Sequence, residues 1–239
     1  MKTIITTALA FTALVGSTAL SSAGTQIFFD DFNGDQLAPH WEVINQDEDS
    51  YIVEDGTLLS IASGGANLSK GNVRNIFRMT NKMPKGDWTA TIKYRMPYQT
   101  GRETPFFALY NDKDNYIAAF ANAWSYYDGT RGSRLFLGSK KVVKGKTSSF
   151  SDVMWGGAGG KPFTADDLPN PFILRITKTG HSYTAAVQIK QGAETTWIEK
   201  ASLTAIRQPG NLAFGIYQSE KVNGETPMSV DWVKVESAD

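Results

Sequence analysis

The chain has 239 residues, with 24 basic and 24 acidic side chains and no cysteine. This charge balance provides no large electrostatic field, so it argues against nucleic acid or an anionic lipid surface as the main partner. Without disulfides, folding must depend on core packing, on a bound metal, or on both.

The first 23 residues have the features of a secretory signal peptide. They contain one basic residue, Lys2, an apolar run over 4–15, and the small residues Ser21 and Ala23. We place cleavage after Ala23. The alternative is a membrane anchor, but threonines interrupt the apolar run, which is shorter than the roughly 20 residues of a spanning helix. The sequence predicts a secreted or periplasmic protein, with 24–239 as a single domain and no integral membrane segment in the mature chain.

Two neighbouring carboxylates, Asp30 and Asp31, stand between aromatic residues in the stretch FFDDFNG at 28–34. Adjacent like charges in apolar surroundings are unfavourable unless a cation, a hydrogen-bond donor or water compensates them. Asp31 shares its strand parity with Ile27 and Phe29, so we expect it on an apolar face. These acids therefore need a partner from elsewhere in the chain.

Short segments with the two-residue periodicity of β-strands dominate the rest of the chain. In 87–96, Trp88 and Ile92 fall on one parity and Lys93 and Arg95 on the other, which indicates a half-buried strand. Similar segments occur at 51–62, 73–80, 105–110, 115–125, 134–137, 172–178, 182–189, 196–203, 211–218 and 228–236, with turn signals such as Asn223-Gly224 between them. The pattern predicts an all-β fold, a two-sheet antiparallel β-sandwich of the jelly-roll kind.

A long loop is expected from about Lys140 to Pro171. The strand pattern stops near 137, and a glycine-rich patch follows at 155–160. Loops of this length in compact domains are often functional. The loop is therefore a candidate part of a binding site.

The last predicted strand, 228–236, carries a charged residue on an apolar parity. Asp231 shares its parity with Val233 and Val235, so it is expected on the buried face. The first and last strands of a sandwich commonly lie side by side. We therefore expect Asp31 and Asp231 to converge.

Four segments together resemble the terminal signatures of the concanavalin A-like lectin and glucanase jelly rolls. They are FDDFNG at 29–34, Trp41, VEDGTL at 53–58 and VDWVKV at 230–235. The resemblance is greatest to family 16 glycoside hydrolases and to LamG-like sugar-binding domains. In addition, ILRITKTGHSYT at 173–184, followed by Trp197, is similar to a hairpin of the LamG-like group. The resemblance implies a concanavalin A-like β-sandwich.

The resemblance also implies a structural calcium ion on the convex side of the sandwich. Carried over position by position, the ligands are Asp31, the backbone carbonyl of Gly56, and Asp231. Hard oxygen ligands from distant parts of a chain suit Ca²⁺, with water completing six to eight positions. The alternative is that Asp30 and Asp31 are exposed strand-end acids capped by nearby amides.

The catalytic motif of family 16 is missing from this sequence. Those hydrolases carry E-x-D-x-x-E on one strand, and retaining hydrolysis needs two carboxylates about 5 to 5.5 Å apart. The strand predicted at 115–124 contains no acid, and the lyase signatures of related jelly rolls are absent as well. We interpret His40 and His181 as turn or surface residues, because no motif gives either one a catalytic partner. The sequence therefore argues against an enzyme.

The leading hypothesis is an exported carbohydrate-binding or polysaccharide-accessory protein. Sugar rings stack on aromatic faces, while polar neighbours bind their hydroxyl groups. The alternative is that the aromatic residues are packing anchors. The residues proposed to bind a polysaccharide or oligosaccharide lie at the end of the strand at 115–125 and in the long loop, and they are Trp124, Tyr126, Tyr127, Arg131 and Trp155.

Two other functions remain open. A glycoside hydrolase or polysaccharide lyase with a dispersed site would draw on Glu103, Asp112, Asp114 or Asp128, although no motif pairs them. A structural envelope protein would use a sheet face as its interface. A convergent acid pair in a cleft favours the enzyme, an aromatic platform favours the binder, and a flat apolar patch favours the interface protein.

Overall fold

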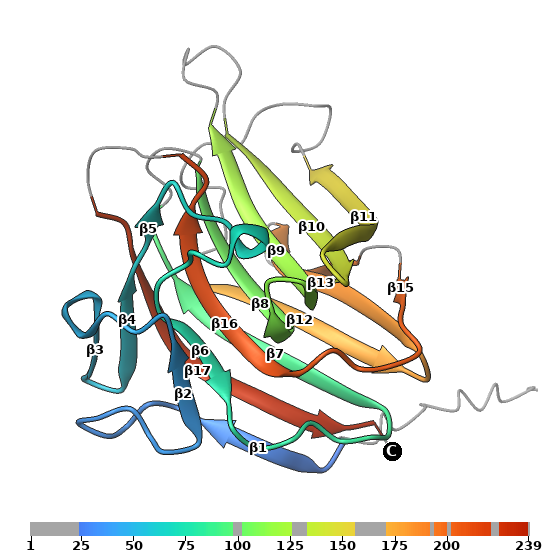
Figure 1. Cartoon of the computed structure of the whole chain (residues 1–239), viewed down its shortest axis with the longest axis horizontal. Helices are drawn as coiled ribbons and strands as arrows, with labels where there is room; N and C mark the ends of the chain where they lie inside the picture. The colour runs from blue at the N-terminus through green and yellow to red at the C-terminus, as the bar shows by residue number, and fades with distance from the viewer. Residues whose placement is uncertain are drawn as a thin grey trace, which may run out of the picture.

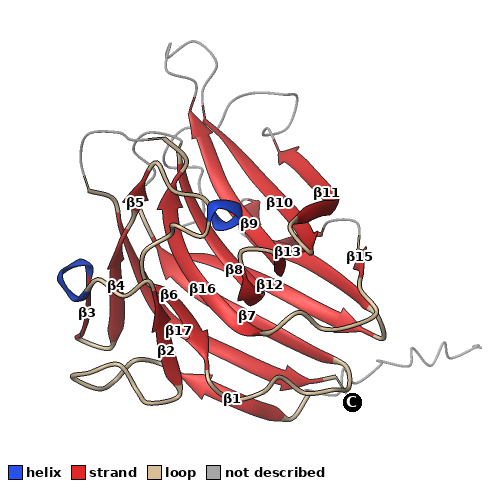
Figure 2. Ribbon diagram, in the orientation of Figure 1, coloured by secondary structure: helices blue, strands red, loops and turns tan. Residues whose placement is uncertain are grey.

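The computed structural model describes residues 24–97, 102–125, 133–155, 171–191, 194–199, 202–220 and 225–238. Within these ranges nearly all regular structure is β-strand (Figure 2). The elements are β1 (Gln26–Asp30), β2 (Trp41–Ile44), η1 (Glu48–Ser50), β3 (Tyr51–Glu54), β4 (Thr57–Ile61), β5 (Ser63–Gly64), η2 (Leu68–Lys70), β6 (Ile76–Met79), β7 (Trp88–Arg95), β8 (Glu103–Asp112), β9 (Asn115–Ser125), β10 (Ser133–Val143), β11 (Lys146–Trp155), β12 (Phe172–Thr179), β13 (Ser182–Gln191), β14 (Glu194–Glu199), β15 (Leu203–Thr204), β16 (Asn211–Gln218) and β17 (Pro227–Ser237). None of the described helices is long and apolar enough to cross a membrane.

The strands form two sheets that pack face to face (Figure 1). Sheet A has the order β14-β13-β12-β7-β17-β4-β3, with β1 beside β17 and β15 beside β13. Sheet B has the order β11-β10-β9-β8-β16-β6-β2, with β5 beside β16. The pairing is antiparallel except between β5 and β16. This architecture confirms the predicted antiparallel β-sandwich.

The main core lies between the two sheets. Sheet A contributes the apolar parity of its strands, as Trp88, Ile92 and Tyr94 in β7 illustrate, each at most 1% exposed. Sheet B contributes Phe107 and Phe214, both fully buried. The alternation predicted from the sequence of β7 is therefore confirmed, because a strand with one covered face buries every second side chain.

The expected loop from Lys140 to Pro171 is wrong over its first half. β10 continues to Val143, and β11 pairs with it from Val143 opposite Lys146 to Leu135 opposite Trp155. The lysines and serines of 139–151 obscure the strand periodicity in the sequence, and β11 is the edge strand of sheet B, paired with β10 alone. Residues 156–170 lie outside the described residues.

The first and last strands are neighbours, as predicted, but the parity of Asp31 is the solvent-facing one. β1 pairs with β17, with Asp30 opposite Val233. Ile27 is 48% exposed and Phe29 is 43% exposed, so these two residues cover no core. The expectation that Asp31 lies on a buried apolar face is wrong.

A bulge in β17 reverses the parity of Asp231. The register with β7 shifts between Val230 and Trp232, and both Val230 and Val233 are fully buried. One extra residue at a bulge moves the following side chains to the other face. Asp231 therefore lies on the outer face of sheet A, although it shares sequence parity with Val233, and its predicted burial in the core is wrong.

Candidate functional site

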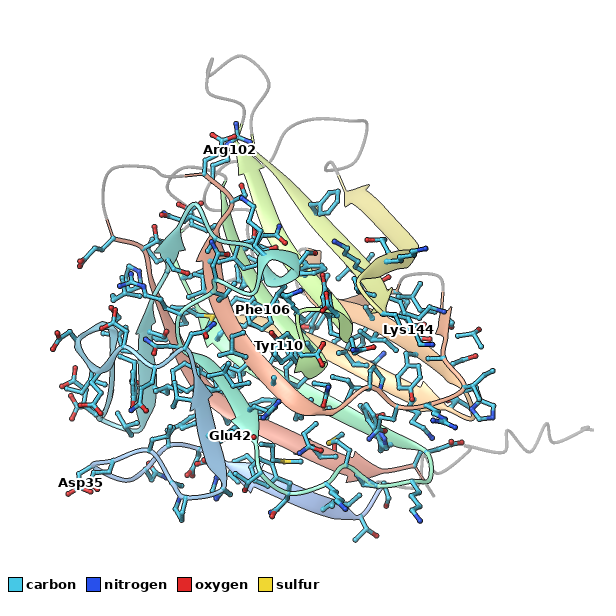
Figure 3. The ribbon with its side chains drawn as sticks, in the orientation of Figure 1. Asp35, Glu42, Arg102, Phe106, Tyr110 and Lys144 are labelled. Atoms are coloured by element: carbon cyan, nitrogen blue, oxygen red, sulfur yellow. The ribbon has the colours of Figure 1, made fainter. Side chains whose placement is uncertain are left out.

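The outer face of sheet B carries a second apolar cluster, separate from the main core. Alternate residues of β8, β9 and β16 face outward, so these central strands are buried on both faces. Figure 3 shows Phe106 and Tyr110 of β8 in the middle of this face. The cluster comprises Ala66, Leu68, Val73, Ile76, Phe106, Ala108, Tyr110, Tyr116, Ala118, Phe120, Val142, Ala213 and Tyr217.

Small residues create the depth of this face. Ala118 lies between Ala108 of β8 and Lys140 of β10 in the register, and Gly138 lies opposite Phe120. A Cβ added to Gly138 would come within 3.0 Å of the Phe136 ring. Phe136 therefore rests close to the backbone of its own strand, which only a glycine at 138 permits without displacement.

The segment 62–75, which includes η2, covers one side of the cluster (Figure 1). Leu68 is 1% exposed and packs onto the outer face of sheet B. The side chain of Asn45 holds this segment in place by donating to the carbonyls of Gly71 and Val73 at 3.0 and 2.8 Å. It therefore forms a wall held by specific hydrogen bonds.

A groove of about 190 Å³ remains between this wall and strands β8, β9, β10 and β16. Aromatic rings dominate its lining, and a few polar groups reach into it. Such a combination of apolar surface with oriented polar groups is typical of small-ligand sites. The lining residues are Asn67, Leu68, Thr104, Tyr116, Phe120, Phe136, Lys140 and Tyr217.

A polar chain joins the wall to the sheet at the edge of the groove. The Nζ of Lys140 donates to the Oγ of Ser69 at 2.9 Å, and this hydroxyl lies 2.8 Å from the hydroxyl of Tyr116. These hydrogen bonds hold the Lys140 ammonium against the Ser69 hydroxyl, which in turn contacts the hydroxyl of Tyr116. Among the described residues that line the groove, Lys140 is the one cation, and none is an acid.

Tyr217 supplies a protonated hydroxyl at the groove. Burial strongly raises the pKa of Tyr217, the neighbouring Tyr116 raises it further, and a hydrogen bond with Thr104 acts in the opposite direction. The phenol therefore stays neutral at physiological pH. It can donate or accept a hydrogen bond but does not act as a base.

The predicted binding residues are only partly placed. Trp124 lies in β9 opposite Arg134, at a register position in the same row as Phe120. Trp155 ends β11 opposite Leu135, in the row of the core residue Leu137. Tyr126, Tyr127 and Arg131 lie outside the described residues, as does Asp128.

The candidate acids do not meet in the groove. Glu103 is fully buried, and its carboxylate accepts from the Thr226 hydroxyl at 3.3 Å and the Arg102 amide at 3.1 Å. Its neighbour Thr104 faces the groove, so Glu103 faces the other way. No described residue of the groove lining is a carboxylate.

Asp112 and Asp114 instead build the turn between β8 and β9. Desolvation alone would raise the pKa of Asp112, but hydrogen bonds from the Asp114 amide and the Asn115 side chain lower it overall. The Asp114 amide donates to Asp112 at 2.8 Å. These acids are hydrogen-bond acceptors of a tight turn.

The three positions implied for calcium converge along β17. β1 ends with Asp30 opposite Val233, and β4 pairs with β17 up to Val230 opposite Leu58, so Asp231 lies between the two strand ends. A Cβ on Gly56 would come within 3.0 Å of the Asn33 side chain, next to Asp31.

The side chains at these positions already have other partners. Asp231 is ion-paired with Lys93 at 3.0 Å and with Arg95, and Asp31 accepts from Asn33 at 2.5 Å. Among the described residues, no group of three or more His, Asp or Glu side chains could hold a metal. An ion here would depend on backbone carbonyls and would compete with the two cations for Asp231.

The acids of the stretch FFDDFNG at 28–34 find partners in β2 and in the turn before it. Asp30 accepts from the His40 ring and the Trp41 indole, both at 2.6 Å, and from the Phe32 amide at 2.8 Å. The interpretation of His40 as an unremarkable surface residue was incomplete. Its contact with Asp30 helps to join sheet A to sheet B.

A larger cavity, of about 410 Å³, opens at the end of the sandwich near the β12–β13 turn. Its buried cation, Lys178, already donates to the carbonyls of Lys85 and Gly86 at 3.0 and 2.7 Å. Its acid, Asp87, accepts from the Gly180 amide at 2.7 Å. These groups satisfy one another, so the smaller aromatic groove is the better candidate site.

Sequence reasoning missed Phe136, Lys140 and Tyr217 as site residues. Phe136 and Lys140 lie two residues to either side of Gly138, and Tyr217 lies near the end of β16, which is apolar from Leu212 to Tyr217. An apolar run on both parities was the available signal, because it marks a strand with two covered faces.

No protein-family model matches the chain, and the comparison with curated proteins finds no match either. Solved structures do share its fold. The GH43 protein BlXynB of Bacillus licheniformis superposes with a TM-score of 0.63 at 15% identity, covering 88% of this chain and 39% of that one. A xylan beta-1,4-xylosidase of Bacillus halodurans gives 0.63 at 12% identity, covering 87% and 39%. The chain thus spans about two fifths of the length of these enzymes.

A third structure matches along its whole length. A Mycobacterium tuberculosis protein described as an immunostimulatory antigen and pseudo beta-1,3-glucanase has a TM-score of 0.54 at 16% identity, covering 90% of this chain and 100% of that one. At such identities the likeness establishes the fold and nothing finer. The chain therefore has the β-sandwich fold of GH43 and related glycoside hydrolase-like proteins.

Proposed function

We propose that this protein is an exported, concanavalin A-like carbohydrate-binding protein that holds a polysaccharide or oligosaccharide in the groove on the outer face of sheet B. The observation that carries the proposal is the groove lining itself, in which the rings of Tyr116, Phe120, Phe136 and Tyr217 accompany polar groups. Rings offer stacking surfaces for the CH faces of sugars, and hydroxyl and amide groups bind sugar hydroxyls.

Binding fits this groove better than hydrolysis does. Glycoside hydrolysis needs two carboxylates placed on either side of the scissile bond. The described lining residues include none, and Glu103 faces away from the groove. The proposal of export rests on the leader-like first 23 residues of the sequence.

Calcium remains part of the proposal as a structural ion. Its support is the convergence of Asp31, the Gly56 turn and Asp231 where β1 and β4 meet β17. Ca²⁺ accepts backbone carbonyls together with one or two carboxylates. The ion would stabilise the strand ends on sheet A and would have no direct contact with the groove.

The test is binding to a panel of β-glucans, xylans, pectins and alginates, measured by calorimetry on the purified protein. Phe136→Ala should weaken binding by about 1 to 3 kcal/mol, a magnitude taken from base stacking on aromatic side chains. Phe29→Ala, which removes an exposed ring from the outer face of sheet A, is the matched control and should leave binding unchanged.

Circular dichroism and thermal melting establish that each variant is folded. Equal losses in Phe136→Ala and Phe29→Ala, or no binding to any glycan, would contradict the proposal. Release of reducing sugar that disappears in a single Asp or Glu variant would favour the hydrolase or lyase alternative.

A further inference from the structure

We propose that the groove recognises an anionic saccharide, and that Lys140 binds the charged group, a uronate carboxylate or a sulfate ester, on a sugar ring. This inference rests on the proposed function and specifies the ligand class of the same groove. Its starting observation is a charge imbalance, since the described lining residues contain one cation and no acid.

Three other buried or partly buried lysines lie near a carboxylate, and Lys141 donates to the Thr204 carbonyl, whereas the partner of Lys140 is a hydroxyl. Lys93 and Lys234 each face a carboxylate, at 3.0 and 2.9 Å. Lys178 is bound by two carbonyls with Asp87 3.7 Å away. Lys140 donates to the hydroxyl of Ser69, and none of the ion pairs between side chains that the structure describes, a set that excludes Asp152, involves it. A neutral hydroxyl orients the ammonium but leaves its charge available.

The position of Lys140 suits a ligand bound on the aromatic surface. Lys140 lies two residues from Gly138, whose backbone is covered by the Phe136 and Phe120 rings, so it stands next to these rings along β10. A sugar stacked on these rings places its ring substituents at the groove edge, within reach of the ammonium. Hydrogen bonds between a charged donor and a charged acceptor are about twice as strong as neutral ones.

One carboxylate position in the neighbourhood must be tested. The register places Asp152 of β11 opposite Gly138, next to the partner of Lys140. If Asp152 neutralised Lys140, the ammonium would be unavailable to a ligand. Asp152→Asn would then strengthen binding of anionic glycans, and removal of Lys140 from the wild-type protein would have no effect.

The experiment compares anionic polymers with neutral counterparts on the purified protein. Polygalacturonate is set beside its fully methyl-esterified form, alginate beside its ester, and dextran sulfate beside dextran. Lys140→Met should weaken binding of the preferred anionic polymer at least about tenfold, as expected when a hydrogen bond between charged groups is lost. It should leave any binding of the neutral counterpart unchanged.

Lys146→Met is the matched control, because Lys146 is exposed at the start of β11 and the variant has the same net charge. The carboxylate and sulfate polymers show which anion is recognised. Equal binding of charged and neutral forms, or equal losses in Lys140→Met and Lys146→Met, would overturn the inference while leaving the proposed function intact. Failure to bind any glycan, charged or neutral, would contradict both.

Discussion

The outer faces of the two sheets differ in chemistry although both sheets cover the same core. The outer face of sheet A is charged: Asp231 pairs with Lys93 and Arg95, and Arg175 pairs with Glu199 at 2.7 Å. The outer face of sheet B holds a buried apolar cluster and an aromatic groove. An apolar outer face is unfavourable unless something covers it. Segment 62–75 covers part of this face, and the groove beside the segment is where we propose that a ligand binds.

The sequences of the strands reflect this difference. β12 alternates between buried and partly exposed residues, as a strand with one solvated face should. β16 is buried at nearly every position, because the core covers one side and segment 62–75 covers the other. Continuous burial in an antiparallel strand therefore indicates a sheet that is covered on both faces, and the proposed groove lies at the edge of that cover.

The largest expected effect is the difference in lost stability between a substitution on the inner face of sheet B and one on its outer face. Phe214 packs against Phe77 and Trp41, with ring centroids 5.2 and 5.1 Å apart, and is fully buried. Phe214→Ala should lower the free energy of unfolding by about 3 to 5 kcal/mol. Phe136→Ala should lower it by less than about 1 kcal/mol. Urea denaturation followed by fluorescence measures both, and similar losses would show that the groove rings are core residues.

Calcium provides the second test, at the most charged point of the outer face of sheet A. If an ion binds at Asp31, Gly56 and Asp231, saturating Ca²⁺ should stabilise the native state by about 2.7 kcal/mol at 100 times its dissociation constant. Chelator should lower Tm, and Asp231→Ala should abolish the difference. Identical melting curves with and without chelator, in protein free of tightly bound metal, would leave Asp231 with the ion pairs alone.

A smaller effect is expected where the two sheets are joined. Asp30 of β1 accepts from His40 and from Trp41 of β2. Asp30→Asn replaces one acceptor oxygen by a donor group that faces these donors, and should cost about 1 to 3 kcal/mol of unfolding free energy. Asp31→Asn, one residue away, should cost much less in the presence of chelator, because the hydrogen bond that the Asp31 side chain makes among the described residues is its exposed one from Asn33. Equal melting temperatures for both variants would refute the proposed importance of Asp30.

The sequence by itself determined the fold class. Alternating apolar residues in β7 and β12, with turn signals between strands, are direct consequences of a pleated strand with one covered face, and they required no knowledge of partners. The sequence also predicted that the first and last strands lie side by side, and β1 does pair with β17. The two-residue alternation can be recognised in the sequence because it arises within each strand, whichever strands become its neighbours.

Only the tertiary structure decided which faces became core, surface and groove. A bulge at Asp231, invisible in the residue pattern, reversed the parity on which its predicted burial depended. β11 was missed because lysines and serines interrupt its apolar pattern, whereas its pairing with β10 is visible only in the structure. The groove combines Leu68, Tyr116 and Tyr217, which become neighbours only when segment 62–75 folds over sheet B. Such contacts join segments that are far apart in the sequence, and the periodicity of a single strand does not show which distant segment will cover its face.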